Sequence, residues 1–140
     1  MTRTPFKVLV IPFHRNPSGR LEYAVLKKGE DYWQGIAGGV EEGETYMEAA
    51  KREAGEEGGI ASDNDFIPLD TVASFSFDNK VITQYAFAVE LKNKDIRLSE
   101  EHSEYRWLPY EEALRLLKWD GDKAALRELH DRLQRGGIGR

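Results

Sequence analysis

The sequence of 140 residues contains no cysteine, which excludes disulfide bonds and metal sites built on thiolates. It also lacks a long apolar run. The first such run, within residues 7–13, is followed by His14 and Arg15 and is too short for the core of a signal peptide or for a membrane span. We therefore expect a cytoplasmic protein that does not enter a membrane, in keeping with a reducing compartment.

Positive charge is not in excess either. The chain has 20 Lys and Arg residues against 25 Asp and Glu residues, which gives a formal net charge of −5. Proteins that bind nucleic acids usually contact the phosphate backbone with an excess of positive charge, so strong nucleic-acid binding is not expected. If the partner is an anion such as a phosphate compound, a divalent metal is the obvious group to neutralise it.

Strand and helix patterns alternate along the chain, with no internal repeat and no linker between domains. Strands are predicted where β-branched and aromatic residues cluster, and helices where apolar residues recur three and four positions apart. Residues 29–45 are rich in glycine and predict an irregular loop with a short extended piece near residues 34–37. The predicted strands span residues 7–13, 21–27, 66–77, 80–91 and 104–110, and the predicted helices span residues 45–58, 109–118 and 122–135.

These elements predict an α/β fold with one domain over residues 1–140. Hairpins, such as the one closed by Asp78 and Asn79, make antiparallel neighbours, and strands that alternate with helices favour parallel ones. The expected architecture is an α/β/α sandwich with a mixed β-sheet. Residues 136–140 are expected to fray. The oligomeric state, monomer or homodimer, stays open.

Three glutamates lie close together near the end of the first predicted helix. Because each helical residue turns by about 100°, Glu53, Glu56 and Glu57 project within an arc of about 100°. Ala49 and Ala50 fall on the same arc, which predicts a face that is acidic and sterically open. Carboxylates four positions apart repel by about 0.2–0.5 kcal/mol per pair. The face is either a solvated acidic surface or a site for a hard cation, Mg²⁺ or Mn²⁺.

The surrounding sequence favours the cation site. Residues 38–60, GGVEEGETYMEAAKREAGEEGGI, resemble the Nudix box, the motif of the Nudix (MutT-like) hydrolases. The motif reads Gly, five residues, Glu, seven residues, Arg-Glu, an aliphatic residue, one residue, Glu-Glu, one residue, Gly and an aliphatic residue. Its defined positions are filled by Gly38, Glu44, Arg52, Glu53, Ala54, Glu56, Glu57, Gly59 and Ile60.

The resemblance implies a Nudix fold and an enzyme that cleaves a nucleoside diphosphate linked to another group with the help of divalent metals. It also implies that Arg52 pairs with Glu44 and holds the helix against the preceding loop. The Mg²⁺ ligands that it implies, with Mn²⁺ possible, are Glu53, Glu56, Glu57 and the backbone carbonyl of Gly38.

A second acidic stretch lies outside the box. Residues 101–107, EHSEYRW, resemble a stretch of several Nudix subfamilies whose glutamate contributes to the metal site. The resemblance therefore adds Glu101 as a metal ligand and as the favoured candidate base for the attacking water; the alternative is that Glu100, Glu101 and Glu104 belong to a polar loop. His102 is another candidate base, but a histidine in a loop is more often solvated.

The residues before the box indicate the substrate. Residues 31–45, DYWQGIAGGVEEGET, resemble the dATP (dihydroneopterin triphosphate) pyrophosphohydrolases. Tyr32 or Trp33 is then expected to stack on a base or a pterin unless it packs in the core, and Lys27 and Lys28 are candidates for phosphate contacts. The expected reaction converts a (deoxy)nucleoside triphosphate, or a related triphosphate, to a monophosphate and pyrophosphate.

The C-terminal half resembles a different branch of the family. Residues 96–117 and 123–133 are similar to diadenosine tetraphosphate hydrolases, but the Pro-Lys-Gly-His run that these enzymes usually carry is IAGGV here. Hydrolysis of a dinucleoside polyphosphate is therefore the alternative function. A Nudix-fold domain that binds a nucleotide without turnover is a third, which the complete set of box glutamates disfavours.

Overall fold

The computed structural model of the protein describes residues 3–136. The predicted fraying of the tail falls, apart from Gly136, outside these residues. Within them, no helix is long and apolar enough to cross a membrane. The elements are β1 (Arg3–Arg15), β2 (Leu21–Lys28), β3 (Tyr32–Gln34), β4 (Ile36–Glu41), α1 (Tyr46–Gly58), β5 (Asp65–Phe77), β6 (Lys80–Glu90), β7 (His102–Leu108), α2 (Tyr110–Leu116) and α3 (Asp120–Gln134).

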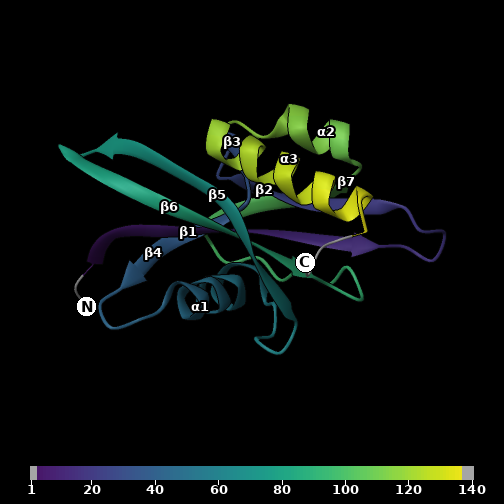
Figure 1. The fold of residues 1–140 in the computed structure, drawn as a ribbon, viewed down its shortest axis with the longest axis horizontal. Helices are drawn as coiled ribbons and strands as arrows, with labels where there is room; N and C mark the ends of the chain where they lie inside the picture. Colours follow the sequence, from purple (N-terminus) through teal and green to yellow (C-terminus); the bar gives the residue numbers. More distant parts are fainter. Residues whose placement is uncertain (1–2, 137–140) are drawn as a thin grey trace.

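The seven strands form one mixed sheet that lies between two helical layers (Figure 1). Helix α1 covers one face of the sheet, and α2 and α3 cover the other (Figure 1). The strand order is β3-β2-β1-β6-β5, with β4 also paired to β1 and β7 to β2. The pair β1–β6 is parallel, and the other pairs are antiparallel. The predicted α/β/α sandwich is therefore confirmed.

The central strand β1 is apolar on both sides because both of its faces are covered. Leu9, Ile11 and Phe13 are buried in the core beneath α2 and α3. Val8 and Val10 are buried in the second core, beneath α1. A strand buried on both faces reads as a continuous apolar run rather than an alternating one, as residues 7–13 do.

The ends of α1 are set by local sequence. Thr45 and Glu48 form a capping box, in which the Thr45 hydroxyl accepts from the Glu48 N–H at 3.0 Å and the Glu48 carboxylate accepts from the Thr45 N–H at 2.8 Å. Gly59 ends the helix with φ +65°. Ala49 and Ala50 are fully buried against the sheet, so the prediction of a sterically open face beside the glutamates is wrong.

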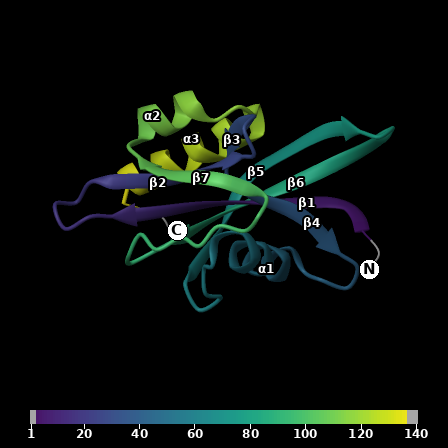
Figure 2. The same cartoon turned by 180° about the vertical axis from the view of Figure 1, so that it is seen from behind.

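The prediction of an irregular loop over residues 29–45 is also wrong for most of that segment. It contains β3 and β4, which are strands because the adjacent β2 and the distant β1 provide their hydrogen-bond partners. Strand β3 pairs with the end of β2, and β4 pairs with β1, where Gly38 lies opposite Val8. Figure 2 shows the sheet from behind, with β7 running beside β2. Residues near Lys28 thereby lie next to the start of β7.

Gly55, within α1, and Gly59, the residue directly after it, are expected to respond oppositely to substitution by alanine. A Cβ at Gly59 would lie 2.8 Å from the Cβ of Arg97, and φ is positive there, so Gly59→Ala should lower the free energy of unfolding by about 1–3 kcal/mol. Gly55 is exposed within the helix, and its nearest contact would be 3.6 Å. Gly55→Ala should therefore raise the free energy of unfolding by up to about 1 kcal/mol. Urea denaturation measures both, and equal effects would contradict this account.

Candidate active site

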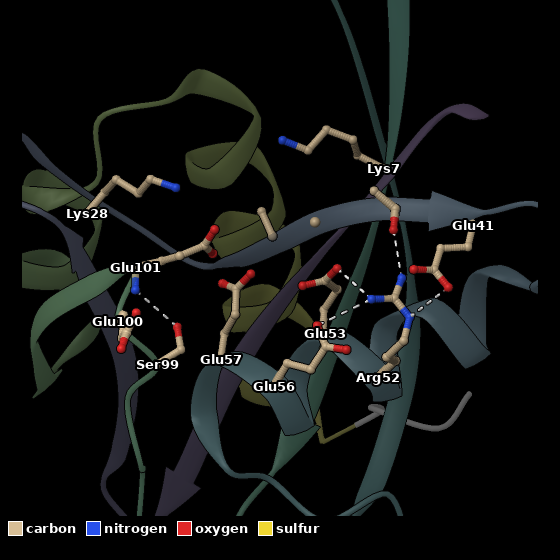
Figure 3. Close-up of a pocket in the computed structure, with 13 residues that line it drawn as sticks. Lys7, Lys28, Glu41, Arg52, Glu53, Glu56, Glu57, Ser99, Glu100 and Glu101 are labelled. Atoms are coloured by element: carbon tan, nitrogen blue, oxygen red, sulfur yellow. Dashed lines mark hydrogen bonds and ion pairs between the residues drawn. The ribbon is translucent and has the colours of Figure 1, made fainter. Parts of the chain in front are cut away.

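An acidic cavity of about 800 Å³ lies between β4, α1 and the segment that precedes β7 (Figure 3). It brings the glutamates of α1 together with Glu101, which is more than forty positions away in the sequence. The backbone of residues 37–39 in β4 also lines it. The charged residues in its lining are Lys7, Lys28, Glu41, Arg52, Glu53, Glu56, Glu57, Glu100 and Glu101.

The three glutamates of α1 differ in burial. Glu53 and Glu57 keep only 7% and 5% of their surface exposed, whereas the Glu56 side chain is 60% exposed. A solvated acidic surface therefore describes Glu56 but not Glu53 or Glu57. Burying a carboxylate is costly unless it is paired or bonded, so these two side chains need specific partners.

Arg52 supplies several of these contacts from the same helix. Its Nε and Nη2 donate to the two oxygens of Glu44, at 2.6 and 3.0 Å. Nη2 also donates to the carbonyl of Gly39 at 2.8 Å, and Nη1 donates to Glu53 at 2.9 Å. The pairing of Arg52 with Glu44 that the resemblance implies is confirmed. The hydrogen bond from Arg52 holds the pKa of Glu44 below its usual value.

Gly38 lies directly against the Glu53 carboxylate. A Cβ at this position would be 2.0 Å from the Glu53 Cδ, which no side chain tolerates. Only glycine allows β4 to pass this closely, and the carboxylate is thereby held between the strand backbone and Arg52. The glycine-rich sequence before α1 reflects this close approach rather than a loop.

Glu57 is slightly less exposed than Glu53, and no Lys or Arg of the described residues forms an ion pair with it. Burial first, and the nearby carboxylates of Glu53 and Glu101 second, raise the pKa of Glu57 to about 9. Its Oε1 is one of two buried side-chain polar atoms that lack a hydrogen-bond partner among the described residues. Figure 3 shows the carboxylates of Glu53, Glu57 and Glu101 directed toward the same space.

The lining is chemically suited to a hard divalent cation. All of its candidate ligands are oxygens, which Mg²⁺ and Mn²⁺ prefer, and the Oε1 of Glu57 is a buried acceptor without a partner that a cation would satisfy. No three acidic or histidine side chains within residues 3–136 converge closely enough to form a complete metal cage. Mg²⁺ usually keeps several waters and takes one or two carboxylates along with substrate phosphates, so such a cage is not required.

Two lysines reach over this space from opposite sides (Figure 3). Lys28, a predicted phosphate contact, lines the cavity. Lys27 does not, because successive residues of β2 point to opposite faces, and it pairs with Glu30 at 3.6 Å instead. Lys7 of β1 takes part although the sequence analysis missed it, since only its position within an apolar strand marks it as unusual.

A second cavity, of about 710 Å³, adjoins the acidic one and shares Lys7 and Ala37 with it. Tyr32 lines it and meets Trp119 edge to face at a centroid distance of 5.1 Å. The other lining residues include Phe75 and Phe77 of β5, Gln34 of β3, Gln84 of β6 and Asp122 of α3. Among residues 3–136, three of the six exposed large hydrophobic side chains, Phe75, Phe77 and Trp119, thus line one cavity. Such exposed aromatic side chains suit a planar ligand.

The structure separates the two neighbouring aromatic residues for which the sequence predicted stacking. Tyr32 faces the second cavity, whereas Trp33 is 9% exposed and packs in the core beneath α2 and α3. The Arg106 guanidinium covers the Trp33 ring at 4.7 Å. Trp119, which the sequence analysis did not single out, joins Tyr32 because the connection between α2 and α3 passes this cavity.

His102 is buried, with 5% of its surface exposed, so the expectation of a solvated histidine is wrong. Its Nε2 lies 3.2 Å from the Gln34 Nε2, and its Nδ1 lies 3.8 Å from the Glu57 Oε1. Burial, with the charge of Lys28 as a second cause, lowers the pKa of His102. Glu101, the preceding residue, is exposed at the cavity.

Residues 8–130 match the NUDIX domain family. The chain is 36% identical over 120 residues to the asymmetrical bis(5'-nucleosyl)-tetraphosphatase of Mus musculus, with 79% of each chain covered. It is 27% identical over 139 residues to the dihydroneopterin triphosphate diphosphatase of Escherichia coli (strain K12), which covers 90% of this chain and 92% of that one. A crystal structure of a Listeria monocytogenes protein assigned to the NUDIX hydrolases superposes with a TM-score of 0.88 at 40% identity, covering 98% of this chain and 99% of that one.

Adjacent glycines in β4 provide a matched test of the contact with Glu53. Gly38→Ala should lower the free energy of unfolding by about 1–3 kcal/mol, because the new Cβ displaces the Glu53 carboxylate. At Gly39 a Cβ would meet no described atom within 4 Å, so Gly39→Ala should change stability by less than about 0.5 kcal/mol. Chemical denaturation of both variants measures this difference. If both variants match the parent, Gly38 is not needed for the contact.

Asp122 should make stability depend on pH. It is 4% exposed, accepts from the Gly35 N–H at 2.9 Å, and burial raises its pKa to about 6 from 3.8. Because the folded state binds this proton more tightly than the unfolded state, the contribution of Asp122 to stability falls as pH rises from about 4 to about 6. As pH rises across that window, the free energy of unfolding of Asp122→Asn should therefore increase by up to about 3 kcal/mol relative to that of the parent.

Denaturation of the parent and of Asp122→Asn at a series of pH values measures this effect, and Asp120→Asn, an exposed change in the same helical turn, is the control. A difference between the parent and Asp122→Asn that stays constant from pH 4 to pH 7 would contradict the prediction.

Proposed function

The chain belongs to the Nudix family and is a hydrolase of phosphoric anhydride bonds in nucleotide polyphosphates, and from this premise we propose that it converts a (deoxy)nucleoside triphosphate, or a related triphosphate, to a monophosphate and pyrophosphate. The observation that carries the proposal is the pairing of two adjoining cavities. One is acidic and the other aromatic, and they meet at Lys7 and Ala37. A substrate with one heterocycle and a polyphosphate chain fits this division.

The acidic cavity would hold the cofactor, Mg²⁺ or Mn²⁺. Arg52 and Glu44 hold β4 and α1 together and are positioning residues in this proposal. Divalent ions bound there would offset the negative charge of the carboxylates and the polyphosphate and lower the pKa of a bound water. The proposed ligands are Glu53, Glu56, Glu57, Glu101 and the backbone carbonyl of Gly38.

Glu101 is our candidate for the base that takes a proton from the attacking water. It lines the cavity, is exposed, and makes no ion pair with any residue of the described chain. By contrast, Glu53 is held by Arg52 and Gly38, so its carboxylate is less free to approach a proton. A base has to lie within hydrogen-bond reach of the water it activates, which an unpaired carboxylate at the cavity surface satisfies most readily.

The substrate would be recognised by residues of both cavities, which meet at Lys7. Lys7 and Lys28 are the proposed phosphate contacts, because their side chains reach over the acidic cavity (Figure 3). Tyr32 and Trp119 would contact the heterocycle, since their rings line the adjoining cavity. The roles of Lys27 and Trp33 in substrate binding lose support, because neither lines either of these two cavities.

Hydrolysis of a dinucleoside polyphosphate is the second candidate. It is supported by the 36% identity to the asymmetrical bis(5'-nucleosyl)-tetraphosphatase of Mus musculus, against 27% for the dihydroneopterin triphosphate diphosphatase. Against it, such a substrate carries a second nucleoside, for which the aromatic cavity beside Lys7 provides one place only.

A substrate panel with Mg²⁺ separates the two functions by their products. Nucleoside triphosphates and dihydroneopterin triphosphate should yield a monophosphate and pyrophosphate, and a bis(5'-nucleosyl) tetraphosphate would yield a mono- and a triphosphate if the alternative holds. Glu56→Gln should lower kcat by about 100-fold or more, because it removes a negative ligand from the proposed metal site. The control Glu112→Gln changes an exposed glutamate of α2 and should retain parental kcat.

Ion chromatography of the products gives the answer for each substrate. No phosphate-bearing product from any member of the panel, with Glu56→Gln equal to the parent, would overturn the proposal. Faster turnover of the tetraphosphate than of every triphosphate would replace the first function by the second.

A further inference from the structure

His102 lies in the interior between the two cavities. It is the first residue of β7 and lies opposite Lys28 in the β2–β7 pair. On one side its ring approaches Glu57, which lines the acidic cavity, and on the other it bonds to Gln34, which lines the aromatic cavity. Only 1% of its side chain is exposed, so the ring does not reach a substrate in either cavity.

An unsatisfied pair of atoms marks this position. Two buried side-chain polar atoms in the described part of the chain have no hydrogen-bond partner, namely Glu57 Oε1 and His102 Nδ1. They face each other at 3.8 Å. A buried polar atom without a partner is unfavourable, and a rotation of the Glu57 carboxylate that brings Oε1 to Nδ1 would satisfy both atoms at once.

The contact with Gln34 determines which ring nitrogen carries the proton. The Gln34 amide nitrogen lies 3.2 Å from Nε2, and an amide nitrogen can only donate. With the Gln34 amide in this orientation, Nε2 is the unprotonated acceptor. In a neutral imidazole the proton then sits on Nδ1, which is the atom that faces Glu57.

Glu57 otherwise lacks a donor that would orient it. Glu53 is held by Arg52 at 2.9 Å and by the close approach of Gly38, but no described N–H or O–H group reaches the Oε1 of Glu57. We propose that His102, held in its Nδ1–H tautomer by Gln34, is a positioning residue that orients the Glu57 carboxylate toward a divalent cation. This inference rests on the proposed function, because it assigns Glu57 a role in cation binding.

The proposal gives the His102 ring a role that needs no contact with substrate. A hydrogen bond to one oxygen of Glu57 leaves the other oxygen to face the cavity in a fixed direction. Partners behind a metal ligand typically change metal affinity by 10–100-fold when they are removed, because the ligand must then be ordered at the moment of binding. Gln34 acts indirectly, because its hydrogen bond to Nε2 keeps the ring proton on Nδ1.

Binding of Mn²⁺ in the absence of substrate tests this role. Titration followed by electron paramagnetic resonance of free Mn²⁺ should show that His102→Leu weakens affinity by about 10–100-fold. His102→Asn places an amide N–H near the position of Nδ1, so its affinity for Mn²⁺ should stay within about threefold of that of the parent. His130→Leu is the matched control, because it removes a second, partly buried imidazole that bonds to Tyr23 at 2.7 Å and lines neither cavity.

The outcomes separate a positioning role from a structural one. If His102→Leu lowers stability in EDTA but binds Mn²⁺ as tightly as the parent, the positioning role is overturned and the proposed function stands. If His102→Asn is as weak as His102→Leu, the Nδ1–H donor is not what matters and the proposal also fails. If the parent itself does not bind Mn²⁺, the proposed metal site and this inference are both overturned.

A spectroscopic measurement on the parent protein avoids the question of whether variants fold. Long-range ¹H–¹⁵N correlation spectra of the metal-free protein, assigned with His102→Asn, report which ring nitrogen is protonated. The Nδ1–H tautomer is expected at neutral pH, and loss of the Gln34 donor in Gln34→Met should shift His102 away from it. An Nε2–H tautomer in the parent would overturn the proposal.

Discussion

The guanidinium of Arg52 is the interaction on which the acidic cavity depends. It donates hydrogen bonds to both oxygens of Glu44, to the carbonyl of Gly39 and to Glu53. These bonds connect the β4–α1 connection, β4 and α1 with one another. Each of these segments brings negative charge or a carbonyl toward one place. A planar group with five fixed donors can satisfy several acceptors at once, which an ammonium cannot do with the same geometry. The charge of Arg52 also offsets the repulsion among carboxylates that a helix alone would not tolerate.

Burial then gives each carboxylate a different character. Glu53 is fixed between Arg52 and the Gly38 backbone, whereas Glu56 and Glu101 remain exposed. Glu57 is buried beside other acids, which raises its pKa to about 9, and the His102 Nδ1 lies 3.8 Å from its Oε1. The cavity is thus lined by a carboxylate that its partners fix, Glu53, a buried one, Glu57, and two exposed ones, Glu56 and Glu101. The differences arise both from Arg52 of the same helix and from the strands packed behind α1.

The sheet also places the aromatic cavity next to the acidic one. Lys7 of β1 faces both cavities, because the central strand runs beneath their boundary. The aromatic side chains of the second cavity come from three distant segments: β3, the β5–β6 hairpin and the connection between α2 and α3. The chain Gln34–His102–Glu57 connects the two cavities through the interior. None of these three residues is near another in the sequence.

The sequence by itself determined the class of fold, most element positions and both ends of α1, and its resemblance to the Nudix box implied the pairing of Arg52 with Glu44. These follow from local periodicity, capping residues and a motif of fixed spacing, all of which are written within short stretches of chain. The tertiary structure alone decided that residues 29–45 form strands, that Tyr32 faces a cavity while Trp33 is buried, and that Lys28 rather than Lys27 lines the site. It also decided that His102 is buried and that Lys7 and Trp119 line the cavities. The physical reason is that strand pairing, the side of the sheet on which a residue lies, and burial all depend on partners from distant segments, which no local pattern contains.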